Sequence, residues 1–376
     1  MNRFERNTKL IFVIFCGLFI SLIAYLSYFT AFQREKLIQS SYNRRIWEQE
    51  EKVLRGTIYD AKGRPLADTI IENDTKARIY PGGEAFGPIL GYSDRQFGRA
   101  GFEDAFNREL LGLSEQDPMI VLRRKLLGVS ERGNDIYLTI DYDLQKLAYE
   151  RFRGRKGAAV AINPKNGAVL AMVSSPGFDS SKVKQNWENL TQNPDKPLIN
   201  RATQGLYPPG SAFKIITLAA ALTNKPEIET KVYYTPGYVK VNGRIIRDSE
   251  GLWAGNFDLK NAFRHSSNSV FIQIAQEIEY DALYQMAESF GFNSRLNTDF
   301  SVAESSFPRA SIMNAEVELA ENAIGQGKVL ATPLQMARVA AIIANGGEDV
   351  IPYVLEKIVS PTGTVEKHET SKEKNR

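Results

Sequence analysis

The longest apolar stretch of the chain lies close to its N-terminus. Residues 10–32, LIFVIFCGLFISLIAYLSYFTAF, carry no charged side chain, and a run of this length can cross a bilayer as a single helix. Basic residues precede it, which favours a cytoplasmic N-terminus, although Arg34 and Lys36 on the far side weaken the charge asymmetry. A cleaved signal peptide is the alternative, but the run exceeds the usual apolar core of one and no small-x-small cleavage site closes it. We therefore predict a cytoplasmic tail at residues 1–9, a single-pass membrane anchor at 10–32 and an exported remainder.

The next hundred residues predict a stem followed by a small pedestal. Residues 33–54 are charged with scattered apolar positions, which indicates a helical or irregular stem. In RGTIYDAKGRPLADT, residues 55–69, two short runs flank a turn in which Gly63 is available for the position with positive φ, so a hairpin is expected. Residues 79–112 are rich in glycine and aromatics and indicate an irregular α+β segment. Residues 33–130 are assigned to this stem and pedestal module, which resembles a dimerisation module.

A second pattern begins near residue 131. Residues 135–140 alternate like a strand, residues 143–152 have helical spacing, and GAAVAINPKNGAVLAMVSS places two apolar runs around Asn-Gly, a strong hairpin signal. Both runs are apolar on both faces, so the hairpin is expected between layers in the middle of a domain. Four helical segments are expected after it, at residues 212–222, 260–278, 280–290 and 332–344, the last closed by Asn-Gly-Gly. A hairpin followed by helices predicts an α+β fold for residues 131–376.

The amino-acid composition limits the kinds of partner and catalytic site that this chain can have. Basic and acidic residues nearly balance at 47 and 44, so nothing suggests a nucleic-acid partner. The single cysteine, Cys16, excludes an intrachain disulfide, and two histidines, His265 and His368, argue against zinc sites built on His and Cys. Catalysis by this chain would depend mainly on Ser, Lys, Tyr, Asp, Glu or Asn.

One lysine stands out in the stretch YPPGSAFKIITLAAAL. Lys214 lies three residues after Ser211, at the start of an apolar helix. The helix dipole and apolar surroundings both disfavour an ammonium group there, so the lysine could take the proton of the serine hydroxyl, and the Ser211 N–H could stabilise an oxyanion. Ser-x-x-Lys occurs three times in the chain, but only this copy follows Pro-Pro-Gly and precedes an apolar helix. The alternative is that Ser211 caps the helix and Lys214 extends to the surface.

A second polar cluster interrupts a helical pattern in FRHSSNSVF. Ser266 is a candidate for relaying protons between Lys214 and a leaving amine, and the amide of Asn268 is a candidate for binding a substrate carbonyl. The alternative is a capping or loop cluster, and the local sequence does not separate the two interpretations.

The order of these motifs resembles a known family. A serine-lysine helix followed some fifty residues later by Ser-x-Asn is similar to the penicillin-recognising transpeptidases. RGTIYDAKGRPLA resembles the N-terminal signature of class B penicillin-binding proteins, and further blocks resemble that family in the same order: GRAGFEDAFNRELLG, LTIDYDLQKLA, GAAVAINPKNGAVLAMVSSPGFD, NRATQGLYPPGSAFK, SSNSVF and IGQGKVLATPLQMA. The short pedestal is more similar to the elongation and sporulation type than to the large division enzymes.

The resemblance implies roles for four residues. Ser211 would be the acylated nucleophile, Lys214 its general base, and Ser266 and Asn268 the second motif. Family members bind peptidoglycan stem peptides ending in D-Ala-D-Ala, expel the last alanine and pass the acyl group to an amine on a neighbouring strand, and β-lactams trap the serine. No metal or organic cofactor is implied. The implied partners are stem peptides, β-lactams, the membrane and a membrane glycan polymerase of the SEDS type.

The third family motif, Lys-Thr-Gly followed by Thr or Ser, does not occur in the printed sequence. The nearest string, SPTGTVEK, has Pro361 in place of the lysine, and we interpret it as a turn between two short strands. The resemblance therefore predicts a transpeptidase domain that is incomplete at its C-terminus, with an exposed edge on the hairpin of residues 157–174. A truncated product, a fragment and a protein completed by another chain are the alternatives. Losing one oxyanion donor would lower the rate about a hundredfold to a thousandfold.

Three other functions compete with the transpeptidase. The first is a penicillin-binding-like scaffold that regulates a membrane glycan polymerase without catalysis. The second is a β-lactam sensor or serine β-lactamase, which the RGTIYD module disfavours because neither needs it. The third is a serine hydrolase that uses His265 as its base.

Overall fold

The computed structural model describes residues 3–32, 53–72, 75–113, 132–249, 254–310 and 315–367. The predicted stem lies almost wholly outside the described residues, as do His368 and the chain beyond it. Helix α1 spans Arg3–Phe32, and its described side chains, from Phe12 to Tyr28, are exposed. Taken over the described residues, no helix is both long and apolar enough to cross a membrane.

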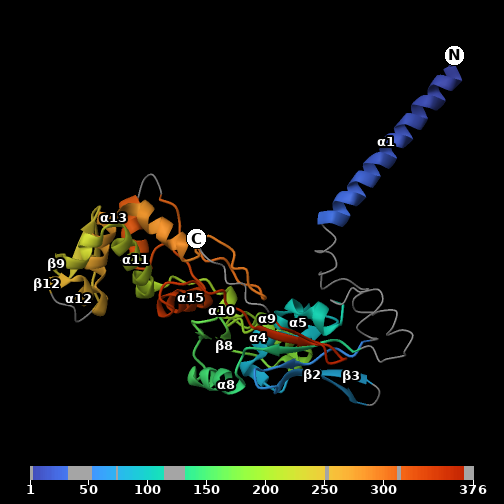
Figure 1. Cartoon of the computed structure of the whole chain (residues 1–376), viewed down its shortest axis with the longest axis horizontal. Helices are drawn as coiled ribbons and strands as arrows, with labels where there is room; N and C mark the ends of the chain where they lie inside the picture. Colours follow the sequence, from blue (N-terminus) through green and yellow to red (C-terminus); the bar gives the residue numbers. More distant parts are fainter. Residues whose placement is uncertain are drawn as a thin grey trace.

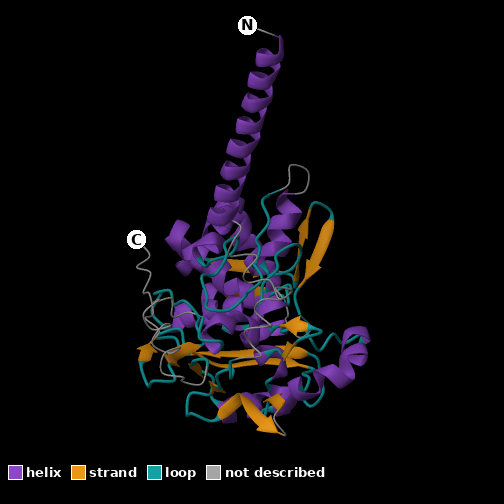
Figure 2. Ribbon diagram, turned by 90° about the vertical axis from the view of Figure 1, so that its right-hand side faces the viewer, coloured by secondary structure: helices purple, strands orange, loops and turns teal. Residues whose placement is uncertain are grey.

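One six-stranded sheet forms one end of the molecule (Figures 1 and 2). Its strand order is β14-β13-β6-β1-β2-β3. The bounds are β1 Ile58–Tyr59, β2 Pro65–Glu72, β3 Thr75–Ile79, β6 Asp135–Leu138, β13 Leu355–Val359 and β14 Val365–Lys367. Strands β1 and β2 pair antiparallel around Gly63, whose φ is 81°, so the predicted hairpin is confirmed.

The same sheet joins segments that are distant in the chain. Strand β6 pairs parallel to β1 and antiparallel to β13. In the segment SPTGTVEK, residues 360–364 form the turn between β13 and β14, where the Gly363 N–H donates to the Ser360 carbonyl at 2.9 Å, and the last three residues are β14. The prediction of a turn between two short strands is therefore confirmed.

Short elements surround this sheet, as the glycine-rich sequence of residues 79–112 predicts. They are η1 Gly83–Ala85, α4 Gly87–Leu90, β4 Ser93–Asp94, β5 Gly98–Arg99, α5 Gly101–Ala105 and α6 Asn107–Leu110. Their apolar side chains share one core with the sheet and with the hairpin that follows, for example Phe86, Phe102, Ile136 and Met172.

The predicted Asn-Gly hairpin forms the middle of the molecule. Strands β7, Gly157–Ile162, and β8, Val169–Ser175, pair antiparallel, and helix α8, Tyr142–Arg151, packs against β8. Gly167 in the turn has a φ of 82°. Strand β8 is largely buried, whereas every residue of β7 is half-exposed. Among the described residues the only strand neighbour of β7 is β8, which leaves one edge unpaired, in agreement with the exposed edge expected for this hairpin. The expectation of a hairpin enclosed between layers holds for β8 and is wrong for β7, whose residues stay half-exposed.

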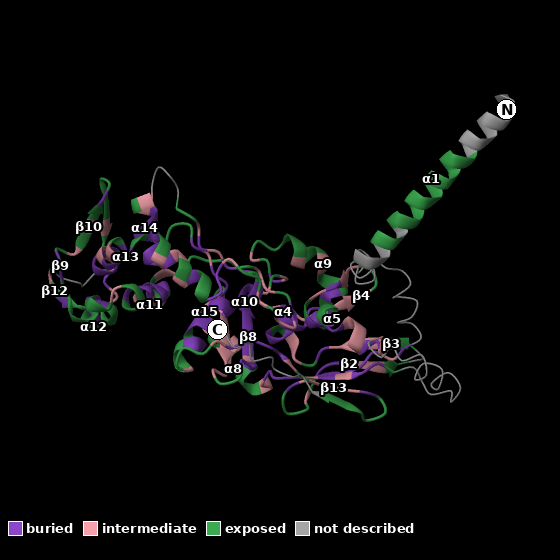
Figure 3. Cartoon of the chain, turned by 45° about the horizontal axis from the view of Figure 1, so that its top comes forward, coloured by how far each residue is buried: buried purple, intermediate pink, exposed green. Residues whose placement is uncertain are grey.

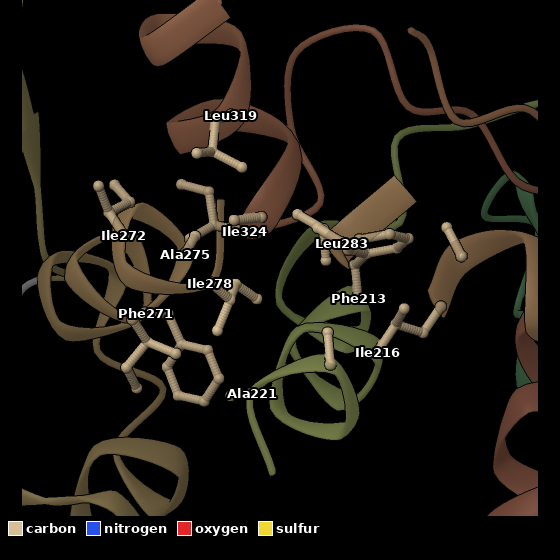
Figure 4. Packing of buried hydrophobic residues seen from close by; sticks show 14 of the residues in the cluster. Phe213, Ile216, Ala221, Phe271, Ile272, Ala275, Ile278, Leu283, Leu319 and Ile324 are labelled. Atoms are coloured by element: carbon tan, nitrogen blue, oxygen red, sulfur yellow. The ribbon is translucent and has the colours of Figure 1, made fainter. Parts of the chain in front are cut away.

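Helices form the opposite end of the molecule and enclose a second core (Figures 3 and 4). Helix α11 packs against α13, and α13 packs against α14. Figure 4 shows Phe213, which immediately precedes α11, next to Leu283 of α13, and Ile216 of α11 belongs to the same core. The bounds at this end are η3 Gly210–Phe213, α11 Lys214–Asn224, η4 Pro226–Thr230, α12 Leu259–Arg264, α13 Asn268–Ser289 and α14 Ala315–Ala323, and α15 Pro333–Ala344 follows in the chain. Three further elements, η2 Ser180–Lys182, α9 Val183–Gln192 and α10 Arg201–Gln204, lie on the side of the sheet and the hairpin, where η2 contacts β3 and α10 contacts β7 and β8.

The helical end differs in part from the elements predicted for it. The helix expected at residues 260–278 is two helices, α12 and α13, because the chain turns at Ser266, where φ is 55°. The predicted boundary near residue 279 corresponds to a kink inside α13, at Glu279 with φ 66° and ψ 171°. Four short strands lie between α11 and α12 that no sequence pattern predicted: β9 Val232–Thr235, β10 Tyr238–Val241, β11 Arg244–Arg247 and β12 Gly255–Asp258.

Helix α15 agrees closely with its prediction. The Thr332 hydroxyl caps its N-terminus by accepting from the Gln335 N–H at 3.1 Å, and the Gly347 N–H donates to the Ile342 carbonyl at its C-terminus. Leu334 belongs to the sheet-side core and Val339 to the helical core. Helix α15 therefore connects the two ends of the molecule.

Candidate active site

Ser211 lies in a 3₁₀ turn immediately before α11. The turn η3 spans Gly210–Phe213, and the α-helix begins at Lys214, three residues later than a helix starting at the serine would require. The Ser211 side chain caps neither element and is exposed. The alternative in which Ser211 serves as an N-cap is therefore wrong.

The approach to Ser211 is held by a distant segment. The Gly210 N–H donates to the Gly325 carbonyl at 2.7 Å, and Tyr207 and Ala331 exchange two backbone hydrogen bonds. A Cβ on Gly325 would lie 1.9 Å from the Gly210 oxygen, and Gly325 has a φ of 70°. Only glycine fits this contact, since any side chain would collide with the residue before the serine.

Lys214 is buried, with 1% of its surface exposed. Its Nζ lies 3.4 Å from Ser211 Oγ, which is a long contact, and 3.0 Å from Ser266 Oγ. It also donates to the Ser266 carbonyl at 2.6 Å and to Asn268 Oδ1 at 2.8 Å. The alternative in which Lys214 extends to the surface is therefore wrong.

The polar cluster caps a helix and also contacts the lysine. Ser267 is the N-cap of α13, since its hydroxyl accepts from the Val270 N–H at 3.2 Å. Ser266 and Asn268, on either side of it, present oxygens to Lys214. Ser211, Ser266 and Asn268 therefore all contact the amine of Lys214, which brings the four predicted site residues together. Ser266 is 52 residues from Lys214 in the sequence.

The lysine is tuned towards its neutral form. Burial removes water from the ammonium group and lowers the pKa of Lys214 from 10.5 to about 8, while the charge of Asp248 opposes this shift. The atoms in contact with Nζ are neutral oxygens, and the ring centroid of Phe271 lies 5.6 Å away. At pH 7 about one molecule in ten then carries a neutral amine, compared with about one in three thousand for an ordinary lysine.

The ring of His265 packs on Phe257 and takes no part in this hydrogen-bond network. Its exposed ring packs edge-on against Phe257, with centroids 6.3 Å apart, while Lys214 contacts the serine. Across the described ranges, no group of three or more His, Cys, Asp or Glu is arranged to hold a metal ion.

Two residues near the site were missed by the sequence analysis. The carboxylate of Asp248, at the end of β11, bonds to Ser267 and Ser269, and Gly325 supports the residue before the nucleophile. No local pattern marks Asp248. Gly325 lies in the block IGQGKVLATPLQMA, whose two nearby glycines were a signal of close backbone packing.

Two family models match separate parts of the chain. The family described as "Penicillin binding protein transpeptidase domain" matches residues 157–376, and the "Penicillin binding protein A dimerisation domain" matches residues 55–136.

Curated relatives carry corresponding names. The peptidoglycan D,D-transpeptidase PbpA of Mycolicibacterium smegmatis is 31% identical over 92% of this chain and 73% of its own length. The peptidoglycan D,D-transpeptidase MrdA of Acinetobacter baumannii is 33% identical over 74% of this chain. The aligned region is 43% of that relative's length, so the chain spans less than half of it.

Solved structures with the same fold include enzymes acylated by β-lactams. The imipenem acyl-enzyme complex of penicillin-binding protein A from Mycobacterium tuberculosis is 31% identical, with a TM-score of 0.79 over 85% of this chain and 77% of that one. PBP2 of Pseudomonas aeruginosa, solved with WCK 5153, is 28% identical with a TM-score of 0.71 over 85% of this chain and 76% of that one.

The resemblance drawn from the sequence motifs, the α+β fold and the transpeptidase activity are thus confirmed at the level of the family. This chain belongs to the class B penicillin-binding proteins, the peptidoglycan D,D-transpeptidase family whose members form acyl-enzymes with β-lactams.

Proposed function

We propose that this chain cross-links peptidoglycan through an acyl intermediate on Ser211, with Lys214 as the general base. The observation that carries the proposal is the buried amine of Lys214, which lies 3.4 Å from Ser211 Oγ and has a pKa lowered to about 8. A neutral amine beside an exposed hydroxyl is what nucleophilic catalysis without histidine requires.

In the first half-reaction, Ser211 Oγ attacks the carbonyl carbon of the penultimate D-alanine. Its proton passes to the neutral amine of Lys214, and the oxyanion that forms is stabilised by N–H groups, among which we assign that of Ser211. The tetrahedral intermediate collapses when the C–N bond breaks. The terminal D-alanine leaves as an amine, and the acyl group remains as an ester on Ser211.

The leaving amine needs a proton, and Ser266 is placed to relay it. Ser266 Oγ lies 3.0 Å from Lys214 Nζ, so a proton on the ammonium can move through the hydroxyl to the nitrogen that departs. The Asn268 amide accepts from Lys214 through Oδ1 at 2.8 Å and donates from Nδ2 to the Arg247 carbonyl. We assign to Asn268 a contact with the substrate as well as this role in holding the amine.

In the second half-reaction, an amine from a neighbouring strand attacks the ester. Lys214, neutral again, takes the proton of that amine, and the Ser211 hydroxyl regains a proton as its oxygen leaves. A β-lactam mimics the D-Ala-D-Ala dipeptide and stops the cycle at the acyl-serine stage. The relatives solved as acyl-enzyme complexes support this substrate class.

The proposal extends to location and partner. Residues 10–32 form a charge-free apolar run within α1, and we assign them to a single-pass anchor with residues 1–9 in the cytoplasm and the site outside. We assign the stem and pedestal to residues 33–130 and the transpeptidase domain to residues 131–376. A membrane glycan polymerase of the SEDS type is the proposed partner, since an anchored cross-linking enzyme acts on newly made strands.

Labelling of the full chain with a fluorescent penicillin tests this proposal. The wild-type chain should be labelled, Ser211→Ala should not, and mass spectrometry should place the adduct on Ser211. Ser181→Ala is the matched control, because Ser181 also begins a Ser-x-x-Lys pattern and has an N–H donor, from Tyr80 at 3.2 Å, but lies outside the site. A folded wild-type chain that takes no label would favour the scaffold function, and an adduct on another side chain would overturn the assignment.

A further inference from the structure

The carboxylate of Asp248 lies outside the predicted Ser-x-Asn motif and hydrogen-bonds to the segment that contains this motif. Asp248 follows strand β11, and its Oδ1 accepts from the Ser267 hydroxyl at 3.1 Å and from the Ser269 N–H at 2.9 Å. Its Oδ2 accepts from the Ser269 hydroxyl at 2.5 Å. One side chain thus holds the two residues that flank Asn268.

The hydroxyls around this carboxylate are buried and connected to each other. Ser267, Ser269 and Thr235 are each 0% exposed. Thr235 Oγ1 lies 2.6 Å from Ser269 Oγ, and the hydroxyls of Ser267 and Ser269 are 3.2 Å apart. Buried hydroxyls without partners are costly, so the network depends on the acceptor that Asp248 supplies.

The same loop orients the Asn268 amide. The carbonyl of Arg247, the residue before Asp248, accepts from Asn268 Nδ2 at 2.9 Å, which directs Oδ1 towards the Lys214 amine. The Asp248 N–H is itself fixed, because it donates to the Gly237 carbonyl at 3.0 Å. The last residue of β11 and the residue that follows it therefore hold the Ser-x-Asn segment from one side.

The backbone is strained at Ser266, the first residue of the Ser-x-Asn motif. Ser266 has a φ of 55°, a left-handed conformation that a residue with a side chain adopts at a cost. In this conformation both the carbonyl and the hydroxyl of Ser266 contact Lys214, at 2.6 and 3.0 Å. Fixing residues 267–269 is what keeps Ser266 in place.

We infer that Asp248 is a positioning residue of this active site: it holds residues 267–269 so that the oxygens of Ser266 and Asn268 converge on the amine of Lys214. This inference rests on the proposed function of Ser211 and Lys214. The carboxylate of Asp248 bonds to Ser267 and Ser269 and not to the nucleophile or the lysine, so it acts through the segment that it holds.

The charge of Asp248 has a second effect. It raises the pKa of Lys214 against the larger effect of burial. The other groups that face the amine are neutral: the hydroxyls of Ser211 and Ser266, the amide of Asn268 and the ring of Phe271. Removing this charge should therefore move the pH dependence of acylation to lower pH.

The test measures the second-order rate constant of acylation by fluorescent penicillin in full-length Asp248→Ala and Asp248→Asn. Asp248→Ala should lower the rate constant about tenfold to a hundredfold, because the hydroxyl network loses its acceptor. Asp248→Asn keeps one acceptor oxygen, so it should recover part of the rate and show its pH midpoint shifted below that of the wild type. Asp258→Asn is the control, a nearby carboxylate that caps α12 through the Asn261 N–H at 2.7 Å, and it should change neither quantity.

The outcomes separate this inference from the proposed function. Wild-type rates and an unchanged pH midpoint in both Asp248 variants would overturn the inference, while loss of labelling in Ser211→Ala would still support the nucleophile. Labelling that survives in Ser211→Ala would overturn the proposed function itself. If Asp248→Ala does not fold, the pH midpoint of Asp248→Asn alone decides.

Discussion

Two buried basic sites lie at opposite ends of this molecule, and they are built differently. At the sheet end, Arg55 and Arg78 surround Glu103, with distances of 2.7 and 2.8 Å to its two carboxylate oxygens, and all three are buried or nearly so. At the helical end, Lys214 is equally buried but its contacts are neutral oxygens. Both sites place a cation out of water, and only the first gives it a carboxylate in contact.

The electrostatic consequences are opposite. Burial alone would raise the pKa of the Glu103 carboxyl, but the charges and hydrogen bonds of Arg55 and Arg78 lower it to about 2. Those charges are fixed at any physiological pH. Burial without a contacting anion lowers the pKa of Lys214 to about 8, so its charge changes near neutrality. A buried charge that contacts an opposite charge stays ionised and stabilises the fold, whereas a buried amine without such a contact can lose its proton and is available for proton transfer.

Lys214→Met should have the largest effect on acylation, because it removes the buried amine of the helical end. The thioether fills similar space but accepts no proton from Ser211, so the acylation rate should fall by about a hundredfold to ten-thousandfold. The free energy of unfolding should change less than in the Glu103 variant described next, because the oxygens of Ser266 and Asn268 lose a donor but no buried charge loses its partner. Acylation kinetics and urea unfolding measure the two quantities, with Lys184→Met, from the exposed Ser-x-x-Lys pattern, as control. Retained acylation would exclude Lys214 as the base.

Glu103→Gln should have the reverse effect. It leaves Arg55 and Arg78 buried without their anion, so the free energy of unfolding should fall by about 3–5 kcal/mol. A folded variant should still be acylated, because Glu103 belongs to the sheet-side part of the molecule. Chemical denaturation with labelling of the folded fraction measures both. An unfolding free energy equal to that of the wild type would show that the buried ion cluster does not stabilise the fold.

The pH dependence of acylation tests the lowered pKa of Lys214, and the expected change in rate is smaller than in the two variants above. The folded pKa of Lys214 is depressed from 10.5 to about 8, so the neutral, reactive form grows as pH rises through 8. The acylation rate should increase about tenfold per pH unit below that value and level off above it. Rates measured from pH 6 to 9.5 test this. A midpoint near 10.5, or a flat profile below pH 8, would contradict a tuned lysine.

Local sequence was a good guide wherever neighbours along the chain decide the structure. Gly63 and Gly167 occupy hairpin turns with positive φ, and the caps of α15 form as expected. Ser211 and Lys214 are one helical turn apart, so their proximity follows from spacing alone. The physical reason is that turns, caps and contacts within one turn of helix involve few residues and little loop closure.

Only the tertiary structure decided the rest. It placed Ser266 beside Lys214 from 52 residues away, buried the amine to 1% exposure, and brought Asp248 and Gly325 to the site although no local pattern marks the aspartate. It also put β13 next to β6 across most of the chain. Such contacts depend on how two cores close around distant segments, and the gain from that burial is shared among many residues, so no short stretch of sequence encodes it.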